Sequence, residues 1–263
     1  MTNELTLDKP CRRGARGGPV QQVQEWLNLH GIAGNIEMDG DFGRITEAAL
    51  KKFQARARLP VTGVVDAATF AALVAPMKAA LAPIAPRGRS LGELTVAYAQ
   101  QHLRQHPREV GGANKGPWVR LYMDGHDGPE FLWCAGFATY CLRAAAEALK
   151  VPMPLPRTYS CDVLGMAARK QGRLLVEPLT PEQRRRITPG SLFLVRKTGS
   201  DWTHTGIIVS ASERELRTIE GNSNDEGSRE GLEVCLRSRG YSRVDIALCD
   251  ARSAVQELHG TLM

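Results

Sequence analysis

The chain has 263 residues, of which 43% are hydrophobic and 24% are charged, so it can bury an ordinary core in each of two domains and is neither disordered nor fibrous. A formal net charge of +6, with a pI of about 9.1, favours anionic partners but does not choose among nucleic acid, acidic polymers and phospholipid surfaces. No run of about 18 apolar residues occurs, so we expect no membrane insertion.

The N-terminal residues 1–18 hold charges and glycines where a secretory signal peptide needs an apolar stretch. We therefore expect a flexible tail here, and synthesis in the cytoplasm without a signal peptide. The basic clusters at 12–16 and 184–186 have no interleaved aromatic side chains to stack on bases. They are predicted to be solvated surface, and no nucleic-acid partner is expected.

Six cysteines are scattered along the chain without a CxxC pair, which favours neither a zinc knuckle nor a small disulfide scaffold. We expect most of them to be reduced and buried. They stand at positions 11, 134, 141, 161, 235 and 249.

Residues 19–76 are predicted to form a small domain of three short helices. Pro19 suits a first helical position, Gly31 ends the first pattern, and Asp66 is a candidate N-cap of the third helix. The residues that recur at the three-to-four spacing of one helix face are Val20, Val23, Leu27 and His30, then Thr46, Ala49, Leu50 and Phe53, then Phe70, Leu73 and Val74.

Two turn-rich segments separate these helices, at 38–43 and 59–63. With them, the order VQxxL…G…DGxFGxxTxxAxxxFQ…LPxxGxxDxxT resembles the peptidoglycan-binding-domain-1 family, a three-helix module appended to wall hydrolases. The resemblance implies peptidoglycan as a partner. Thr62 and Asp66 depart from the family's usual Asp and Gly, which puts a second acidic contact in doubt but not the fold. The alternative is an unrelated three-helix bundle.

Residues 77–90 are rich in alanine and proline and are predicted to be a linker. Ser90 and Glu93 then form an S-x-x-E capping box that begins a new domain over 91–251, followed by a C-terminal tail over 252–263. Helices are predicted near Cys134 and at Thr180-Pro181, and strands at 191–197, 205–212, 216–220 and 244–249. Helices that precede an antiparallel sheet predict an α+β domain.

Cys134 is the candidate nucleophile, because it stands where a loop becomes an alanine-rich helix. The free amides and the dipole of a helix N-terminus lower a thiol pKa and can also hold an oxyanion. Cys141 lies two turns further along the same helix face and is predicted to be a core residue.

His204 is the candidate base, since it begins the apolar run 205–209, whose strand would fix its position. The imidazole also needs an orienting group, and Glu220 or Asn222 can supply it from the end of the next strand. In an antiparallel hairpin the start of one strand lies beside the end of the next, which brings Glu220 near His204.

Taken together, WCAxF, PGSLFLV, HTGIIV and EGN, in this order, resemble the CHAP family of cysteine- and histidine-dependent amidohydrolases and peptidases, within the papain-like and NlpC/P60-like superfamily. The resemblance covers about 91–251. It implies that Cys134 is the nucleophile, His204 the base, and Glu220 with Asn222 the orienting and polarising pair. Family members commonly cleave amide bonds of peptidoglycan, between N-acetylmuramic acid and L-alanine or within the stem or bridge peptide.

Trp133 and Trp202 flank the candidate nucleophile and base in sequence, so they are predicted to line a substrate cleft, with core packing as the alternative. The loop 124–130 before Cys134 is rich in oxygen ligands, and some CHAP domains bind calcium in the corresponding region. It lacks EF-hand spacing. We expect no required cofactor and keep calcium as an alternative to a solvated turn.

The sequence thus predicts a monomeric peptidoglycan amidase or endopeptidase that acts in the periplasm or cell wall. Two delivery routes fit: release of a phage endolysin through a holin, or injection of an antibacterial effector, for which secretion machinery or an immunity protein would be further partners. Two other functions are kept, a non-catalytic wall-binding protein and a cysteine protease or transamidase acting on proteins. The wall-binding module argues against the latter, because tethering raises effective concentration only for a wall substrate.

Overall fold

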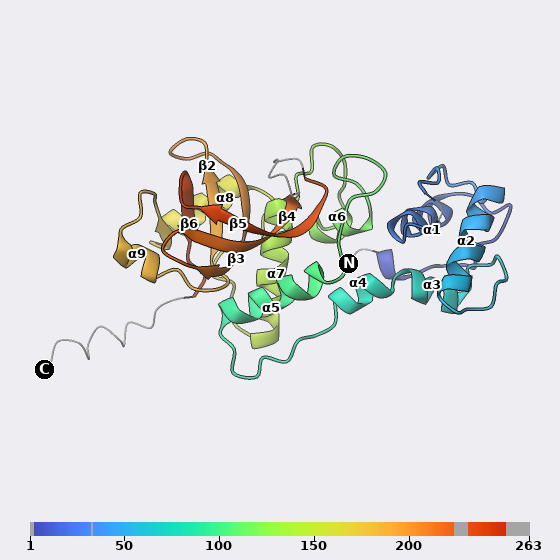
Figure 1. The fold of residues 1–263 in the computed structure, drawn as a ribbon, viewed down its shortest axis with the longest axis horizontal. Helices are drawn as coiled ribbons and strands as arrows, with labels where there is room; N and C mark the ends of the chain where they lie inside the picture. The colour runs from blue at the N-terminus through green and yellow to red at the C-terminus, as the bar shows by residue number, and fades with distance from the viewer. Residues whose placement is uncertain (1–2, 33, 224–230, 251–263) are drawn as a thin grey trace, which may run out of the picture.

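A six-stranded antiparallel sheet with helices packed against it is joined to a group of short N-terminal helices (Figure 1). The computed structural model describes residues 3–32, 34–223 and 231–250, so the predicted tail 252–263 lies outside the described residues. The predicted α+β class, with a helical N-terminal part, is confirmed. No helix in the described ranges is long and apolar enough to cross a bilayer.

The three predicted N-terminal helices are present as α1 (Gly18–Leu29), α2 (Arg44–Arg56) and α3 (Ala67–Leu73). The Asp66 side chain caps α3 by accepting a hydrogen bond from the Thr69 amide at 2.8 Å. The predicted apolar faces are buried, with side chains such as Leu50 and Leu73 fully enclosed. Burial of these faces is what stabilises helices too short to persist alone.

Residues 3–17 differ from the predicted flexible tail. A short 3₁₀ helix, η1 (Asn3–Leu5), opens the described chain, and Cys11 and Arg16 form β-bridges to Val65 and Asp41. Glu4 is only 7% exposed because its carboxylate pairs with Arg120, 116 positions away. Three of the charges that suggested a solvated tail, Glu4, Arg13 and Arg16, therefore have partners in the fold.

The predicted linker also begins later than expected. Helix α4 (Ala75–Ala80) continues directly from α3, and Met77 and Ala80 are fully buried. The following coil is attached to α5 (Leu91–Leu103), since Gln101 donates to the Ala80 and Ala82 carbonyls. Prolines stop the helix only beyond these residues, so the first part of the alanine-rich segment is helical.

Ser90 and Glu93 form the predicted capping box at the start of α5. The later helices are α6 (Pro117–Tyr122), α7 (Cys134–Leu149), α8 (Cys161–Lys170) and α9 (Pro181–Arg185). Helices α7 and α9 match the predictions at Cys134 and Thr180-Pro181, whereas α6 and α8 were not predicted.

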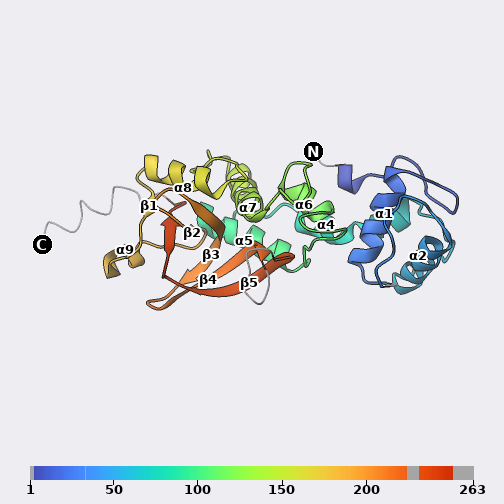
Figure 2. The same ribbon diagram turned by 90° about the horizontal axis from the view of Figure 1, so that it is seen from above.

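The strands run antiparallel in the order β1-β6-β2-β3-β4-β5. Four correspond to the predicted segments, and β1 and β5 are additional. Helix α7 packs on β3 and β4, and α8 packs on β3 (Figure 2). The bounds are β1 (Leu174–Leu175), β2 (Leu192–Arg196), β3 (Trp202–Ala211), β4 (Glu215–Ser223), β5 (Glu233–Gly240) and β6 (Val244–Ala247).

Two glycines allow these helices to approach the sheet closely. A Cβ at Gly221 of β4 would lie 2.7 Å from the Phe137 Cβ of α7, and one at Gly165 of α8 would lie 2.6 Å from the ring of Trp202 in β3. Real Cβ atoms do not make such contacts, so any side chain here would push α7 or α8 away from the sheet. The first turns of both helices are thereby held against β3 and β4.

Arg120 of α6 joins the N-terminal helices to the rest of the chain. Its guanidinium lies 2.6 Å from Glu4, 2.6 Å from Glu25 of α1 and 2.9 Å from Asp127. Trp26 of α1 also packs edge-on against Trp118 of α6, with ring centroids 6.2 Å apart. The N-terminal helices therefore share a packed, charge-paired interface with the sheet-containing part.

Candidate active site

Cys134 is the first residue of α7, at the position where the sequence predicted a nucleophile. No side chain caps this helix, so the amides of its first turn are available to an anion. The residue is 4% exposed and lines a cavity of about 350 Å³. The other lining residues are Leu132, Tyr159, Ser160, Cys161, Asp162, Trp202, Thr203 and Asn222.

His204 of β3 and Glu220 of β4 form a buried pair. His204 Nε2 lies 2.9 Å from Glu220 Oε2, and the two residues are 4% and 0% exposed. The hairpin argument is confirmed, because adjacent antiparallel strands bring these residues together across 16 positions. With Nε2 bonded to the carboxylate, Nδ1 is the ring nitrogen left to interact with Cys134.

The structure favours a thiolate on Cys134 and an imidazolium on His204. A hydrogen bond from Cys161, together with the interaction with His204, holds the pKa of Cys134 well below its usual range, although burial opposes the shift. Burial alone would lower the pKa of His204, but the interactions with Cys134 and Glu220 raise it to about 9. The two groups therefore stabilise each other's charges.

Arg239 of β5 neutralises the buried Glu220 carboxylate from its other side. Its Nε and Nη2 atoms lie 2.6 Å and 2.5 Å from the two carboxylate oxygens, and Thr218 donates a further hydrogen bond at 2.6 Å. Burial works against the charge, yet Arg239 and His204 lower the pKa of Glu220 to about 2. Glu220 is consequently a fixed anion beneath the imidazole.

Asn222 does not share the orienting role with Glu220, as the resemblance had implied. Among the contacts of the described residues, no hydrogen bond joins Asn222 to His204, and Asn222 instead lines the cavity. Its Oδ1 atom is buried without a partner in the described part of the chain. The backbone at Asn222 is in the left-handed conformation, with φ 52°.

The two tryptophans have different environments. Trp133 is fully buried, stacks on Tyr122 and donates from Nε1 to Glu109 at 2.8 Å, so it is a core residue and the predicted cleft position is wrong. Trp202 does line the cavity. Its backbone amide donates to Asp162 at 2.6 Å and its Nε1 to Asp245 at 2.9 Å.

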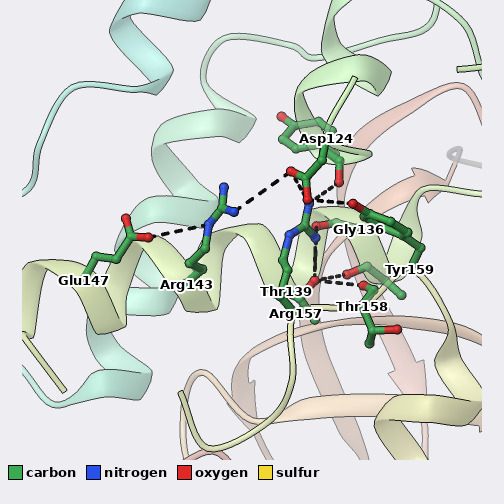
Figure 3. A network of polar contacts seen from close by, with 10 residues as sticks. Asp124, Gly136, Thr139, Arg143, Glu147, Arg157, Thr158 and Tyr159 are labelled. Atoms are coloured by element: carbon green, nitrogen blue, oxygen red, sulfur yellow. Dashed lines mark hydrogen bonds and ion pairs between the residues drawn. The ribbon is translucent and has the colours of Figure 1, made fainter. Parts of the chain in front are cut away.

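Arg157 holds the first turn of α7 in place (Figure 3). It donates to the Gly136 carbonyl and to Thr139 Oγ1, both at 2.7 Å, and it also binds the Asp124 carboxylate at 3.2 Å. Tyr159, which lines the cavity, donates to the same carboxylate at 2.6 Å. This network ties the wall of the cavity to the helix that presents Cys134.

Two of the three carboxylates of the loop 124–130 are bound to protein cations. Asp124 is bound to Arg157, whereas Asp127 is bound to Arg120 and the Gly116 amide. Within the ranges that the structure describes, no group of three His, Cys, Asp or Glu residues has the arrangement to hold a metal ion. The calcium alternative has no observation here that favours it.

All six cysteines are free and buried, as predicted for most of them. Cys141 is fully enclosed in the core, and burial raises its pKa, which agrees with a packing role. Cys161 differs from the others because its sulfur lies 3.8 Å from the sulfur of Cys134.

Sequence reasoning missed Arg239, Arg157 and Cys161. Arg239 stands on a strand that the pattern did not reveal, and Arg157 follows a proline-rich loop. Cys161 had one usable signal, the Ser160 N-cap before it, which marks a second helix that begins at a cysteine.

Comparison with known families identifies the N-terminal part. The family model described as a putative peptidoglycan binding domain matches residues 16–73. The predicted wall-binding module is thus confirmed, and it associates the chain with the cell wall. No curated protein matches the chain.

Proposed function

We propose that the chain hydrolyses an amide bond of peptidoglycan by Cys–His nucleophilic catalysis, as an N-acetylmuramoyl-L-alanine amidase or a stem or bridge endopeptidase. The observation that carries the proposal is the pairing of Cys134, at the head of α7, with a His204 ring held by Glu220. The peptidoglycan-binding domain of the same chain supports the choice of substrate.

Acylation begins with the Cys134 thiolate, which attacks the carbonyl carbon of the scissile amide. The amides of the first α7 turn, which no side chain caps, serve as donors to the developing oxyanion, and the helix dipole adds to their effect. His204 gives its Nδ1 proton to the leaving amine as the tetrahedral intermediate collapses. Glu220 stabilises the imidazolium before this transfer.

Deacylation reverses the role of the imidazole. The neutral His204 ring takes a proton from water, the resulting hydroxide attacks the thioester, and the Cys134 thiolate leaves. The carboxylate of Glu220 keeps its negative charge, since Arg239 and His204 together lower its pKa to about 2 in spite of burial. The acid product and the amine product are released with the enzyme restored.

The fold type that suits this chemistry is the papain-like arrangement of the NlpC/P60 and CHAP families. A helix headed by the nucleophile packs on an antiparallel sheet whose successive strands carry the base and its orienting carboxylate. The chain has these parts in the same sequence order, with α7 before β3 and β4.

The wall-binding module contributes by proximity. It is packed against the sheet-containing part through Arg120 and the Trp26–Trp118 contact, so a bound wall polymer is held at a fixed position relative to Cys134. Such tethering raises the effective concentration of substrate without any new contact at the reacting bond.

Digestion of purified sacculi, followed by mass spectrometry of the released fragments, tests the proposal. The wild-type chain is expected to release fragments with a new amine and a new carboxyl end, and Cys134→Ala to release none while still sedimenting with sacculi. Wild-type sedimentation without new ends would indicate a non-catalytic wall-binding protein. Cleavage or cross-linking of protein substrates alone would indicate a protease or transamidase. Cys141→Ala is the matched control, because Cys141 lies on the same helix but away from the cavity.

A further inference from the structure

Two thiols meet in the candidate active site, although the proposed acyl transfer uses only one. The sulfur atoms of Cys134 and Cys161 are 3.8 Å apart, and both residues line the same cavity of about 350 Å³. None of the other four cysteines has a sulfur atom as a hydrogen-bonding neighbour within the described ranges. Cys161 therefore has the Cys134 sulfur as a neighbour and lines a cavity through which a small molecule can reach it. These two features suit a residue that reacts.

The approach of the two sulfurs is set by helix packing. Cys134 begins the 16-residue helix α7 and Cys161 begins the 10-residue helix α8. Ser160 caps α8, and the Asp162 carboxylate accepts from the Trp202 amide at 2.6 Å, which attaches the first α8 turn to β3. Both cysteines consequently stand at helix N-termini, where the dipole of α7 favours a thiolate on Cys134, while the neighbouring Cys134 sulfur and burial raise the pKa of Cys161 and keep it a thiol.

A disulfide between these residues needs only a small movement. The sulfur atoms must close from 3.8 Å to about 2.0 Å, a shift of about 1.8 Å between two side chains that are already neighbours. A thiolate that faces a neighbouring thiol in an accessible site is the usual arrangement of a redox-active cysteine and its resolving partner.

We propose that Cys134 and Cys161 form a reversible modification site for low-molecular-weight disulfides, with Cys161 as the resolving cysteine. The Cys134 thiolate attacks one sulfur of the small disulfide, forming a mixed disulfide and releasing one thiolate. This thiolate takes the Cys161 proton, and the Cys161 sulfur then attacks the Cys134 sulfur, forming the Cys134–Cys161 bond and expelling the second thiolate, which takes a proton from water. Two protein thiols are oxidised and one small disulfide is reduced to two thiols.

Closure of this bond removes the nucleophile, so the modified chain is inactive until a thiol reductant reopens it. The loss of activity rests on the proposed function, whereas formation of the disulfide does not.

The test is incubation of the full chain with oxidised glutathione, alkylation of the remaining thiols, and mass spectrometry after trypsin. Cleavage at the flanking arginines puts Cys134 in residues 121–143 and Cys161 in residues 158–169. The wild-type chain is expected to give these two peptides joined, with fragment ions that assign the bond to Cys134 rather than Cys141. A wild-type chain that keeps glutathione on Cys134, or in which both thiols are alkylated, would overturn the proposal.

Two variants test whether Cys161 is the resolving cysteine. Cys161→Ser is expected to stop at the glutathione adduct of Cys134, whereas Cys11→Ser, which removes an equally buried thiol in the N-terminal part, is expected to close the bond as the wild type does. The rate of sacculus hydrolysis, measured on the same samples, should fall as the Cys134–Cys161 disulfide forms and should recover when dithiothreitol reduces it. If the reduced chain hydrolyses nothing, the proposed function fails while peptide mapping still decides the modification site.

Discussion

His204 Nε2 lies 2.9 Å from Glu220 Oε2, and this contact leaves the opposite ring nitrogen, Nδ1, to interact with the Cys134 sulfur. The contact is wholly buried, and Arg239 bonds both oxygens of the same carboxylate. The imidazole is thus fixed in orientation and favoured in its charged form.

The pH dependence of kcat/KM should show an alkaline limb near pH 9. Burial lowers the pKa of His204, but Cys134 and Glu220 outweigh it and raise the value to about 9, so the proton needed by the leaving amine is lost as pH rises through this value. Glu220→Gln removes one of the two raising interactions and should move the limb to lower pH. An alkaline limb at the same pH in the wild type and in Glu220→Gln would contradict its assignment to His204.

Arg239→Gln should destabilise the fold by about 3 kcal/mol at pH 7, because it removes one of the two cations, Arg239 and His204, that pair with the buried Glu220 carboxylate. Glu220 has its pKa lowered from 4.5 to about 2, so its contribution is present above pH 4.5 and lost as pH falls toward 2. The variant should therefore lose less stability over this acid range than the wild type does. Denaturant unfolding at several pH values measures both effects, with exposed Arg214→Gln as control.

Gly221→Ala should reduce kcat by moving α7 away from β4. The added Cβ would meet Phe137 at 2.7 Å and Trp133 at 2.8 Å, so one or both must shift, at a cost of about 1–3 kcal/mol. The control is Gly240→Ala at the end of β5, where a Cβ has nothing within 4 Å. Equal activity and equal melting temperature in the two variants would show that the close packing of α7 on β4 matters neither for catalysis nor for stability.

Tyr159 and Trp133 should behave oppositely when they are substituted. Tyr159 lines the cavity and is 38% exposed, so Tyr159→Ala is expected to raise KM with little loss of stability. Trp133→Phe removes the hydrogen bond to the half-buried Glu109 and should cost about 1–3 kcal/mol of stability with KM unchanged. Steady-state kinetics on soluble muropeptides, paired with thermal unfolding, separates the two roles.

Local signals in the sequence were sufficient for several helices and for the central residues of the site, although α4, α6 and α8 were not predicted. The Ser90–Glu93 box, the Asp66 cap and the helix that begins at Cys134 depend on contacts within a few residues, and each was predicted. The His204–Glu220 pair was predictable because hairpin topology relates two neighbouring strands.

Long-range partners were not predictable in the same way. Arg239 reaches Glu220 only because β5 pairs with β4, and Glu4 finds Arg120 only when α1 packs on α6. Trp133 was placed in the cleft because it adjoins Cys134 in sequence, yet the first helical turn directs it into the core beside Tyr122. Adjacency in sequence does not fix which way a side chain points at a helix start.

The most direct test of the account is the pH dependence of Cys134 alkylation by iodoacetamide in the wild type and in His204→Ala, with residues 121–143 followed by mass spectrometry. The account predicts that wild-type Cys134 reacts at its full rate at a pH well below its ordinary pKa of 9.0, and that His204→Ala reaches this rate only at higher pH. Superimposable profiles, both rising near pH 9, would contradict the thiolate–imidazolium pair.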